Sequence, residues 1–375
     1  MPRRLLAISH SYVVGTNRAL PNALAARGWE VTVAAPAQLR GDLRSIVLES
    51  AETDKARVVP VNVHGSRFAH VMRWGSGLRE LLREPWDIVH AWEEPYVLAG
   101  AQIARWHQRG ALVYSTFQNI AKRYPPPFSW FESYSLGRAA GWIAFGRTVE
   151  ETLARRQGYG QVPHRQIPPA IDVDRFTGDE ETRSAVRDEL KTSPGEVLIG
   201  FVGRFVPAKG LALLTAALDA MTAPWRAVFV GGGPLERTLL HWSARHGDRV
   251  RVLTGVTHAR VPRYLNALDV LAVPSLTTRR WREQFGRVIV EGMAAGVAVV
   301  ASDSGEIPHV AADAALVVPE GNVAVWATAL DRLASEPELR QRLAASGLQR
   351  AQQFSAANVA GAHDEFFTAL LEGRR

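Results

Sequence analysis

The sequence predicts an α/β protein with two Rossmann-like, doubly wound domains. A length of 375 residues exceeds what one ordinary core serves, so two domains are expected. Both halves alternate short apolar runs with helical patterns, which is typical of parallel sheets with helices on both faces. Paired prolines after an apolar run, Pro168 and Pro169, indicate a linker. We therefore expect domains at 1–170 and 171–355, followed by a final helix at 356–375.

The distribution of charge and the absence of cysteine limit the partners and the kinds of site that can be expected. Residues 1–170 hold 21 basic and 13 acidic side chains, a net charge of +8, whereas the remaining residues hold 23 and 24, a net of −1. A basic half is typical of proteins that meet nucleic acid, an anionic membrane surface or an anionic substrate, although a solvated arginine-rich surface would look the same. The absence of cysteine excludes disulfides, thiolate nucleophiles and cysteine metal sites.

No run of 18 apolar residues occurs in the sequence, so no membrane-spanning segment is expected. The first apolar run is too short for a signal peptide and is better explained as a strand. A cytoplasmic location fits these observations, with peripheral contact at the inner face of the membrane as a further expectation.

In the first half, apolar runs predict seven strands, at 5–9, 30–34, 58–63, 87–91, 112–116, 141–145 and 165–167. Helical patterns lie between them, at 18–27, 77–83, 97–109 and 149–157. Ligands of such sheets bind beyond the carboxyl ends of the strands. Polar residues that follow the strands are therefore candidates for binding: His10, Glu93, Glu94, Gln118, Lys122 and Arg123.

Two residues near these strand ends allow two interpretations. Gly15 can let backbone approach a ligand at a helix start, or it can be a plain turn glycine. His90 can contribute to a site or serve a structural role in the core. The pattern G-x-G-x-x-G is absent here, which argues against a nicotinamide or flavin site.

Aromatic and basic residues gather in two segments of the first half. Three prolines at 125–127 precede an aromatic stretch that includes Phe128 and Trp130, with Lys122 and Arg123 in front of it. A second segment places Arg73, Trp74, Arg79 and Arg83 close together in the sequence. Exposed, such residues suit a sugar or the headgroup region of a bilayer. Buried, the first segment is a loop that leads into a packed helix.

The second half predicts strands at 197–202, 227–230, 250–253, 268–273 and 316–318. Helices are expected at 179–190, 211–220, 323–333, 338–353 and 356–371, with another that ends near Arg245. The loop after the first of these strands carries Arg204 and Lys209 between Gly203 and Gly210. Two cations and two glycines at a strand-to-helix turn favour an anion site, with a solvated loop as the alternative.

The most informative stretch is 282–296, which follows a polar loop and then reads as a helix with Val288, Ile289, Met293 and Ala294 on its apolar side, ended by Gly296. Glu283 lies just before the helix and Glu291 on its second turn, about 12 Å apart. A helix N-terminus suits a phosphate, and each carboxylate can accept hydrogen bonds from the hydroxyls of one sugar ring. This spacing fits a nucleotide-diphosphate-sugar, whereas two solvated glutamates on a surface helix are the alternative.

Four features of the sequence occur together: Glu283-x7-Glu291 with Phe285-Gly286 between, the segment 298–308, Arg204 with Lys209, and the proline linker. In these features the sequence resembles the family 4 retaining glycosyltransferases. These are nucleotide-sugar-dependent enzymes of the GT-B fold. The resemblance implies two domains that face each other across a cleft, with the final helix crossing back to the first domain. The first domain would bind the acceptor and the second the nucleotide-sugar.

The resemblance also implies the activity. A hexosyl group would move from a GDP- or UDP-sugar to a hydroxyl of a glycan or lipid-linked glycan, in cell-surface polysaccharide or glycolipid synthesis. The anomeric configuration would be retained, and neither a metal nor a cofactor would be needed. Glu283, with the backbone N–H groups of Phe285 and Gly286, would hold the donor sugar, and Glu291 the ribose. Arg204 and Lys209 would stabilise the leaving diphosphate. The expected donor contacts also include Gly15, Gly203, Val256 and Gln284.

Two positions depart from the family pattern. Gln118 stands where many relatives have a histidine that contacts the donor sugar, and it cannot carry a charge. Thr16 replaces the second glycine of a usual pair. These departures support an alternative, a non-catalytic GT-B protein that binds nucleotide-sugar or an anionic membrane surface. Nucleic acid is not an expected partner, because a recognition motif is missing and the charge of the second half is balanced.

Overall fold

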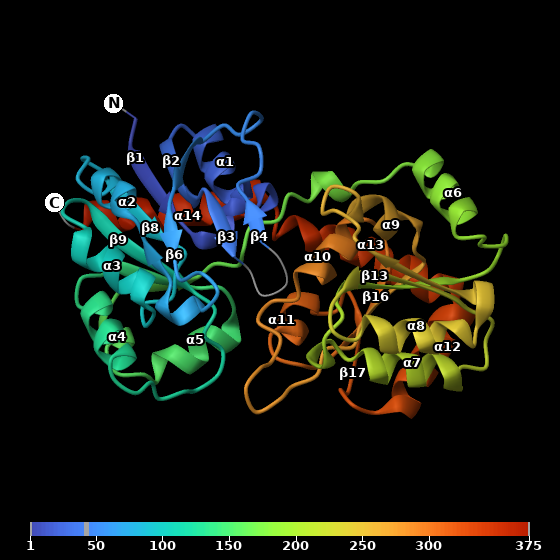
Figure 1. The fold of residues 1–375 in the computed structure, drawn as a ribbon. Coiled ribbons are helices and arrows are strands. Elements are labelled where there is room, and N and C mark those ends of the chain that lie inside the picture. Colours follow the sequence, from blue (N-terminus) through green and yellow to red (C-terminus); the bar gives the residue numbers. More distant parts are fainter. Residues whose placement is uncertain (1, 41–44, 374–375) are drawn as a thin grey trace. The chain divides into compact units, whose positions relative to one another are not determined.

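The computed structural model describes residues 2–40 and 45–373. It forms two compact units, of which the first comprises Met1–Ile171 with Ser355–Arg375 and the second Asp172–Phe354. Each unit is a sheet with helices on both faces (Figure 1). Met1, Arg374 and Arg375, which the predicted domain ranges include, lie outside the described residues. The prediction of two Rossmann-like α/β domains is confirmed.

The first unit is built on a seven-stranded sheet in the order β11-β10-β9-β8-β1-β2-β5, and all neighbours are parallel. Its strands are β1 (Arg4–Ile8), β2 (Glu30–Pro36), β5 (Arg57–Val61), β8 (Ile88–Ala91), β9 (Ala111–Thr116), β10 (Gly141–Ala144) and β11 (His164–Gln166). The chain builds one side of the sheet from β1 and then returns to build the other side from β8. The strand order therefore reverses between β1 and β8, which is the switch point of this sheet.

Side chains alternate across the first sheet, as the two-residue period of a strand requires. Leu5 and Ala7 of β1 join one buried cluster, whereas Leu6 and Ile8 join another. Helices α1 (Ala19–Ala26) and α14 (Ala356–Glu372) cover the first cluster. Helices α2 (Ser76–Leu81), α3 (Leu98–Trp106), α4 (Phe128–Leu136) and α5 (Arg147–Ala154) contribute to the second.

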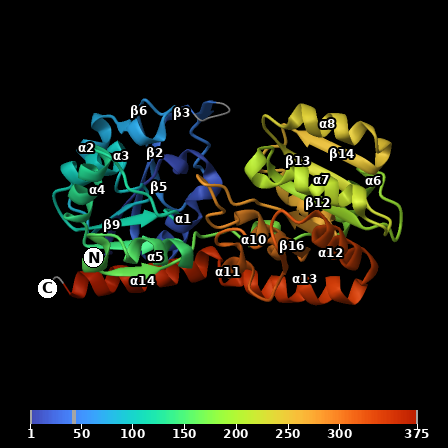
Figure 2. The same cartoon turned by 90° about the horizontal axis from the view of Figure 1, so that it is seen from below.

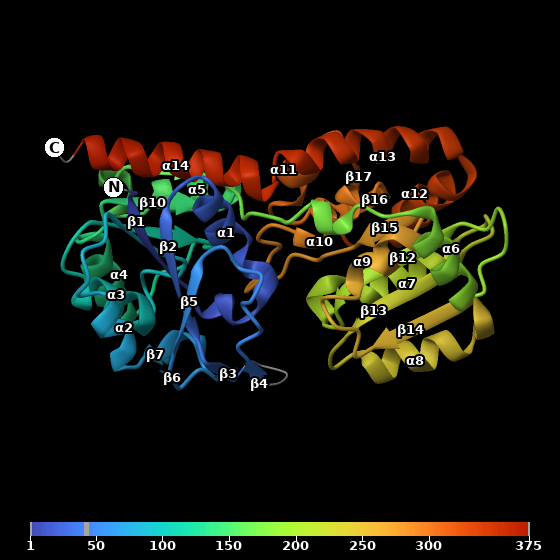
Figure 3. The same ribbon diagram turned by 90° about the horizontal axis from the view of Figure 1, so that it is seen from above.

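The final helix α14 belongs to the first unit, as the predicted fold requires. It runs along this unit beside α1 (Figures 2 and 3). The Trp29 indole N–H donates to Asp364 Oδ1 at 2.9 Å, and its ring meets Phe367 edge-on at 6.0 Å. Burial of Phe366, Phe367 and Leu370 then fixes the helix over the sheet.

Two small hairpins in the first unit were not predicted. They pair β3 (Gln38–Arg40) with β4 (Ser45–Val47), and β6 (Val63–His64) with β7 (Arg73–Trp74). Trp74 is only 2% exposed, because β7 turns its indole into the cluster that contains Leu78. Trp74 would suit a sugar or a bilayer only if exposed, and its burial removes it from any such surface.

The second unit is built on a six-stranded parallel sheet in the order β14-β13-β12-β15-β16-β17. Its strands are β12 (Leu198–Arg204), β13 (Arg226–Gly232), β14 (Val250–Thr254), β15 (Val270–Val273), β16 (Ala298–Ser302) and β17 (Leu316–Val318). Here the order reverses between β12 and β15. Each sheet thus has one switch point, next to the strand that begins its unit.

Helices cover both faces of the second sheet. Helices α7 (Leu211–Ala220), α8 (Glu236–Ala244) and α12 (Val323–Ser335) bury Leu214, Trp242 and Trp326 in one core cluster. The other helices are α6 (Glu180–Glu189), α9 (Val261–Ala267), α10 (Arg287–Ala294), α11 (Ile307–Ala311) and α13 (Pro337–Gln352). Helices α10 and α13 pack against each other and against β16. None of the helices in the described residues is long and apolar enough to cross a membrane.

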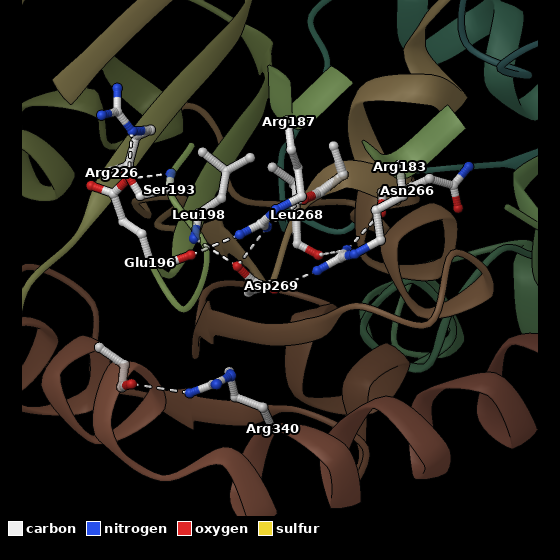
Figure 4. Close-up of polar contacts among 12 residues, drawn as sticks. Arg183, Arg187, Ser193, Glu196, Leu198, Arg226, Asn266, Leu268, Asp269 and Arg340 are labelled. Atoms are coloured by element: carbon white, nitrogen blue, oxygen red, sulfur yellow. Dashed lines mark hydrogen bonds and ion pairs between the residues drawn. The ribbon is translucent and has the colours of Figure 1, made fainter. Parts of the chain in front are cut away.

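A carboxylate fastens α6 to the amino ends of β12 and β15 (Figure 4). Asp269 accepts from Arg183 at 2.6 Å, from Arg187 at 2.9 Å and from the Leu198 N–H at 2.7 Å. Asp179 caps the same helix by accepting from the Thr182 N–H at 2.7 Å. The charged segment 179–190 therefore forms a helix through its polar contacts rather than through a wide apolar face.

Candidate active site

The loops that follow β12 and β15 meet at the switch point of the second sheet. The Leu276 N–H donates to the Ala208 carbonyl at 2.8 Å, which joins the two loops. Gly210 lies between Lys209 and α7 with φ of +71°, and a side chain there would collide with the Pro274 carbonyl. Glycine is therefore required for the loop that carries Lys209 to approach the end of β15.

Glu283 and Lys209, which lie 74 residues apart in the sequence, form one ion pair. The Lys209 Nζ donates to Glu283 Oε2 at 2.5 Å, and the Ser275 hydroxyl donates to the same oxygen at 2.8 Å. The Glu306 N–H holds the Glu283 carbonyl at 3.0 Å. Glu283 is only 7% exposed, so the predicted sugar ligand is a fixed, buried carboxylate beside a predicted phosphate ligand.

Trp281 completes this cluster, although the sequence analysis did not single it out. The Lys209 ammonium lies 5.2 Å from the centre of the Trp281 ring, within the range of a cation–π contact. The Thr278 N–H donates to the Trp281 carbonyl at 2.7 Å and closes the loop. The available signal was an aromatic residue two positions before Glu283, which alone says little about position in space.

Arg204 lies at the end of β12 and is exposed. The strand extends further than predicted, through Gly203 and Arg204, because Gly231 and Gly232 extend β13 and pair with them. Among residues 2–40 and 45–373, the Arg204 guanidinium has no hydrogen-bond or ion-pair partner. The structure thus leaves this cation available at the carboxyl edge of the second sheet.

Helix α10 begins after Gly286, whose φ of +77° is the left-handed conformation that glycine favours. Its buried face differs from the predicted one, because Val290 is buried and Val288 is half-exposed. Because the helix starts at Arg287, its turns place Val290 beside Ile289 and Met293 on the buried face.

The remaining donor candidates of the second unit have different surroundings. Glu291, on the second turn of α10, accepts from Arg287 Nε at 2.9 Å, and its side chain is 15% exposed. The Phe285 side chain is buried against Phe354, so only its backbone can contact a ligand. Gln284 is exposed, and Val256 is half-buried in the loop after β14. The donor roles of these residues stay predictions.

In the first unit, His10 follows β1 and Glu93 follows β8, so the two meet at the switch point of that sheet. Glu93 Oε1 accepts from the His10 N–H and from His10 Nδ1, both at 2.8 Å, and its Oε2 lies 3.0 Å from Nδ1. The Glu93 side chain is 3% exposed and that of His10 is 43% exposed. Burial lowers the pKa of His10, but the charge and hydrogen bond of Glu93 outweigh it, and the pKa is raised.

Gln118 faces the interior of the first unit and is 7% exposed. Its amide N–H groups donate to Glu94 at 2.9 Å and to the Tyr159 hydroxyl at 3.3 Å. Its amide oxygen accepts from Arg156 at 2.8 Å and from Tyr124 at 3.2 Å. All four hydrogen-bonding positions of the amide are occupied. A hydrogen bond from Gln118 to a sugar, the predicted role, would require one of these bonds to open.

The residues around Gln118 form a polar network that the sequence analysis missed. Arg156 pairs with Glu132 at 3.1 Å and stacks its guanidinium 4.7 Å from the Tyr124 ring. Glu94 accepts from the Thr116 hydroxyl at 2.6 Å and the Phe117 N–H at 2.8 Å. Burial nevertheless raises the pKa of Glu94. Glu94 is thus occupied by Thr116, Phe117 and Gln118, whereas its neighbour Glu93 is held by His10.

Other first-unit candidates are also clarified. The Gly15 N–H donates to the Glu49 carboxylate at 2.7 Å, so a protein anion already occupies this amide. Lys122 and Arg123 are exposed. His90 is 1% exposed, contacts Ser115 at 2.7 Å and packs against His363, and burial keeps its pKa well below the ordinary value. These surroundings favour the structural interpretation of His90.

The predicted aromatic segment forms α4, a packed helix that still presents aromatic residues to solvent. We define the α4 patch as four exposed apolar side chains of the first unit: Phe68, Val71, Trp130 and Tyr134. Their exposed fractions are 64%, 47%, 67% and 44%, respectively. His70, between the first two, lies 5.7 Å from the half-buried Phe128 ring of α4. Both interpretations of the segment therefore hold in part.

No group of three or more metal-ligating side chains occurs within the part of the chain that the structure describes. Two family models match the sequence. The model described as glycosyl transferases group 1 matches residues 182–350, and the model described as glycosyltransferase family 4 matches residues 16–175.

Curated relatives are similar over part of their length. A D-inositol 3-phosphate glycosyltransferase of Nocardia farcinica is 32% identical over 240 residues, which cover 60% of this chain and 52% of the relative. A putative teichuronic acid biosynthesis glycosyltransferase of Bacillus subtilis is 29% identical over 174 residues, covering 46% and 41%, respectively. The chain thus spans about half the length of the curated relatives it matches.

Solved structures share the fold over nearly the whole chain. HepE from Anabaena, in complex with UDP and glucose, has a TM-score of 0.77 at 18% identity, covering 98% of this chain and 100% of that one. A sucrose-phosphate synthase from Thermosynechococcus elongatus has a TM-score of 0.74 at 22% identity, covering 99% and 100%. At these identities the likeness establishes the fold alone.

Proposed function

Since the chain belongs to glycosyltransferase family 4, we propose that it moves a hexosyl group from a nucleotide-diphosphate-sugar to an acceptor hydroxyl, with retained configuration. The observation that carries the proposal is the cluster at the switch point of the second sheet. Glu283 is buried beside Lys209 and Ser275. Arg204, which has no partner among the described residues, lies at the end of β12, the strand that precedes Lys209. A carboxylate for sugar hydroxyls and cations for a diphosphate are the two groups that a nucleotide-sugar requires.

In the proposed reaction, the protein stabilises the leaving diphosphate. Negative charge on the diphosphate grows in the transition state, so Arg204 and Lys209 contribute most there. Lys209 has three N–H donors, of which Glu283 uses one. The proton of the acceptor hydroxyl passes to an oxygen of the leaving phosphate on the same face of the sugar, which requires no protein base. In this proposal the two cations, Arg204 and Lys209, take the place of a metal ion, so the reaction is metal-independent.

The test is product formation with a panel of UDP- and GDP-hexoses, in which UDP-glucose comes first because the similarly folded HepE was solved with that compound. Activity should persist in EDTA, and NMR of the product should show the anomeric configuration of the donor. Glu283→Gln should abolish turnover, whereas Glu338→Gln, at an exposed position of α13, should leave it intact. Donor binding without turnover for every sugar would instead favour a non-catalytic binding protein.

The acceptor in this proposal is a glycan or lipid-linked glycan that meets the first unit, in cell-surface polysaccharide or glycolipid synthesis. The α4 patch supports peripheral membrane contact, because exposed Trp130 and Phe68 share this unit with exposed Lys122 and Arg123. Each cation near an anionic surface adds about 1 kcal/mol. Trp130→Ala should reduce co-sedimentation with anionic vesicles at low salt. Leu240→Ala, which removes a different exposed apolar side chain, 45% exposed, from α8 of the second unit, is the control. Equal sedimentation of the two variants would refute the membrane contact and leave the transferase proposal standing.

A further inference from the structure

Both sheets carry a cation–carboxylate pair at their switch points. In the second unit the pair is Lys209 and Glu283, from the loops after β12 and β15. In the first unit the pair is His10 and Glu93, from the loops after β1 and β8. Open α/β sheets bind ligands at this position. The first unit therefore has its own candidate ligand position. It differs from that of the second unit because its cation is the histidine His10 rather than a lysine.

The burial of Glu93 makes His10 a cation. The Glu93 side chain is 3% exposed, and within the described residues its oxygens accept hydrogen bonds from His10 alone. An ionised carboxylate without a counter-charge is costly to bury. The contacting imidazole can supply that charge, and its geometry, with Nδ1 between the two carboxylate oxygens at 2.8 and 3.0 Å, suits a charge-assisted bond.

The same geometry leaves the other ring nitrogen for a ligand. His10 Nε2 has no hydrogen-bond partner in residues 2–40 and 45–373, and the His10 side chain is 43% exposed. Two other titratable groups face this pair. Glu94 is held by Thr116 and Gln118, and the Tyr12 hydroxyl is buried with a raised pKa, so it stays neutral. The Nε2–H of His10 is therefore the outward-facing charged donor of this cluster.

We propose that the His10–Glu93 pair binds a phosphate group carried by the acceptor. His10 Nε2–H donates to a phosphate oxygen, and Glu93 is a positioning residue that fixes the charge and the orientation of the ring. A neutral sugar hydroxyl would need only a neutral imidazole or amide, whereas a buried carboxylate that keeps His10 charged suits an anion. The net charge of +8 over residues 1–170 would also attract an anion to this unit. The inference rests on the proposed function, which gives the acceptor to the first unit.

The proposal fixes the sign of the pH dependence. The His10 pKa is raised, so the imidazolium persists to higher pH than that of an ordinary histidine and is lost as pH rises through that pKa. Phosphate affinity should therefore fall on the alkaline side of the His10 titration. A bound phosphate should in turn raise the His10 pKa further, because the two equilibria are linked.

The experiment follows the imidazole signals of the full chain by NMR, with three probes: inorganic phosphate, D-inositol 3-phosphate and vesicles containing phosphatidylglycerol. We expect a saturable shift of the His10 signal and at least tenfold weaker phosphate binding in His10→Gln and Glu93→Gln. His64→Gln, at an exposed position of the same unit, should bind as the native chain does. His10→Lys should retain binding and should not lose affinity as pH rises through the His10 titration, which keeps the test decisive if Glu93→Gln does not fold. A response to inositol phosphate alone identifies a soluble phosphorylated acceptor, and a response to vesicles identifies a lipid headgroup.

A His10 signal that none of the three probes moves would overturn the proposal. Calorimetry with UDP and GDP on the same samples separates this failure from failure of the transferase proposal, because nucleotide affinity tests the second unit. If nucleotide binds but no probe shifts the His10 signal, the phosphate site is refuted and the donor assignment stands. A His10 response without nucleotide binding retains the phosphate site and counts against the donor assignment.

Discussion

At the amino edge of the second sheet, Asp269 accepts hydrogen bonds from Arg183, Arg187 and the Leu198 N–H. Further N–H groups of both arginines donate to backbone carbonyls (Figure 4). At the carboxyl edge, Lys209 has Glu283 as its one carboxylate, and Arg204 has no partner among the described residues. Both edges carry basic and acidic side chains. At the amino edge the hydrogen-bond donors of the cations have partners within the protein, whereas at the carboxyl edge some donors do not. Saturated cations stabilise a fold, whereas cations with donors to spare can bind a ligand.

The largest expected effect is on stability, at the saturated edge. Asp269→Ala would leave two partly buried guanidinium groups without their carboxylate and should lower the free energy of unfolding by about 4 kcal/mol. Urea unfolding of the chain measures this loss. Asp248→Ala is the control, since Asp248 pairs with Lys191 and Arg251 at an exposed position and should barely move the transition. Equal effects of the two variants would break the comparison.

The next effect is on turnover, at the unsaturated edge. Lys209→Ala and Arg204→Ala should each lower kcat by about 100-fold, or about 3 kcal/mol, because these cations face charge that grows in the transition state. The unfolding transition should change little in Arg204→Ala, whereas Lys209→Ala also leaves the buried Glu283 without its counter-charge and should lower stability. Steady-state kinetics with the best donor of the panel provide the measurement. A rise in KM at constant kcat would indicate uniform binding of donor and transition state, contrary to this prediction.

Acid should act on a third kind of polar group, a buried imidazole that is satisfied at one nitrogen only, where Nδ1 contacts the Val359 carbonyl at 2.9 Å. His363 Nε2 is buried and has no partner among the described residues, and burial lowers the His363 pKa to about 4. The unfolded chain, with an ordinary pKa near 6.5, therefore binds more protons between pH 6.5 and 4, so stability falls as pH drops through this window. The loss should reach about 2 kcal/mol at pH 5.

Urea unfolding at pH 7.5 and pH 5 measures this acid effect. His363→Leu should reduce the difference between the two pH values, because the variant has no imidazole to protonate at that position. If His363→Leu and the native chain lost the same stability, the dependence would have to come from other groups.

The smallest effect concerns donor affinity. Glu291→Ala should weaken nucleotide binding by about 1.5–3 kcal/mol, the range for a hydrogen bond to a charged group, without change in the fold. Calorimetry with UDP and GDP provides the measurement. Arg287→Ala is the informative partner variant, because it removes the internal partner of Glu291 but keeps the carboxylate. Unchanged affinity in Glu291→Ala would end the assignment of this residue to the ribose.

The sequence was sufficient for the elements whose signal is local. Helix α7 and strand β17 have the predicted bounds, because continuous apolar runs and clear turn residues delimit them. The hairpin strands β4 and β7 were missed, because two or three residues cannot show a period. The exposure of Trp74 was consequently left open, and β7 turns it inward.

The candidate site was predictable residue by residue but not as an arrangement. Glu283 and Lys209 were both identified, while their ion pair depends on the close approach of two loops at Gly210. The inward position of Gln118 depends on Tyr124, Arg156 and Tyr159, which come from separate parts of the chain. A network of this kind has no spacing that a sequence can reveal.

The return of α14 to the first unit makes the second unit an insertion within the first. The Ala356 N–H donates to the Ile171 carbonyl at 2.9 Å, so the chain leaves the first unit and re-enters it at adjacent points. During synthesis the second unit is complete while the first still lacks the helix that covers Trp29. A circular permutant that begins at residue 355 would reverse this order. A short linker from 171 to 355 should release the first unit as an independent protein.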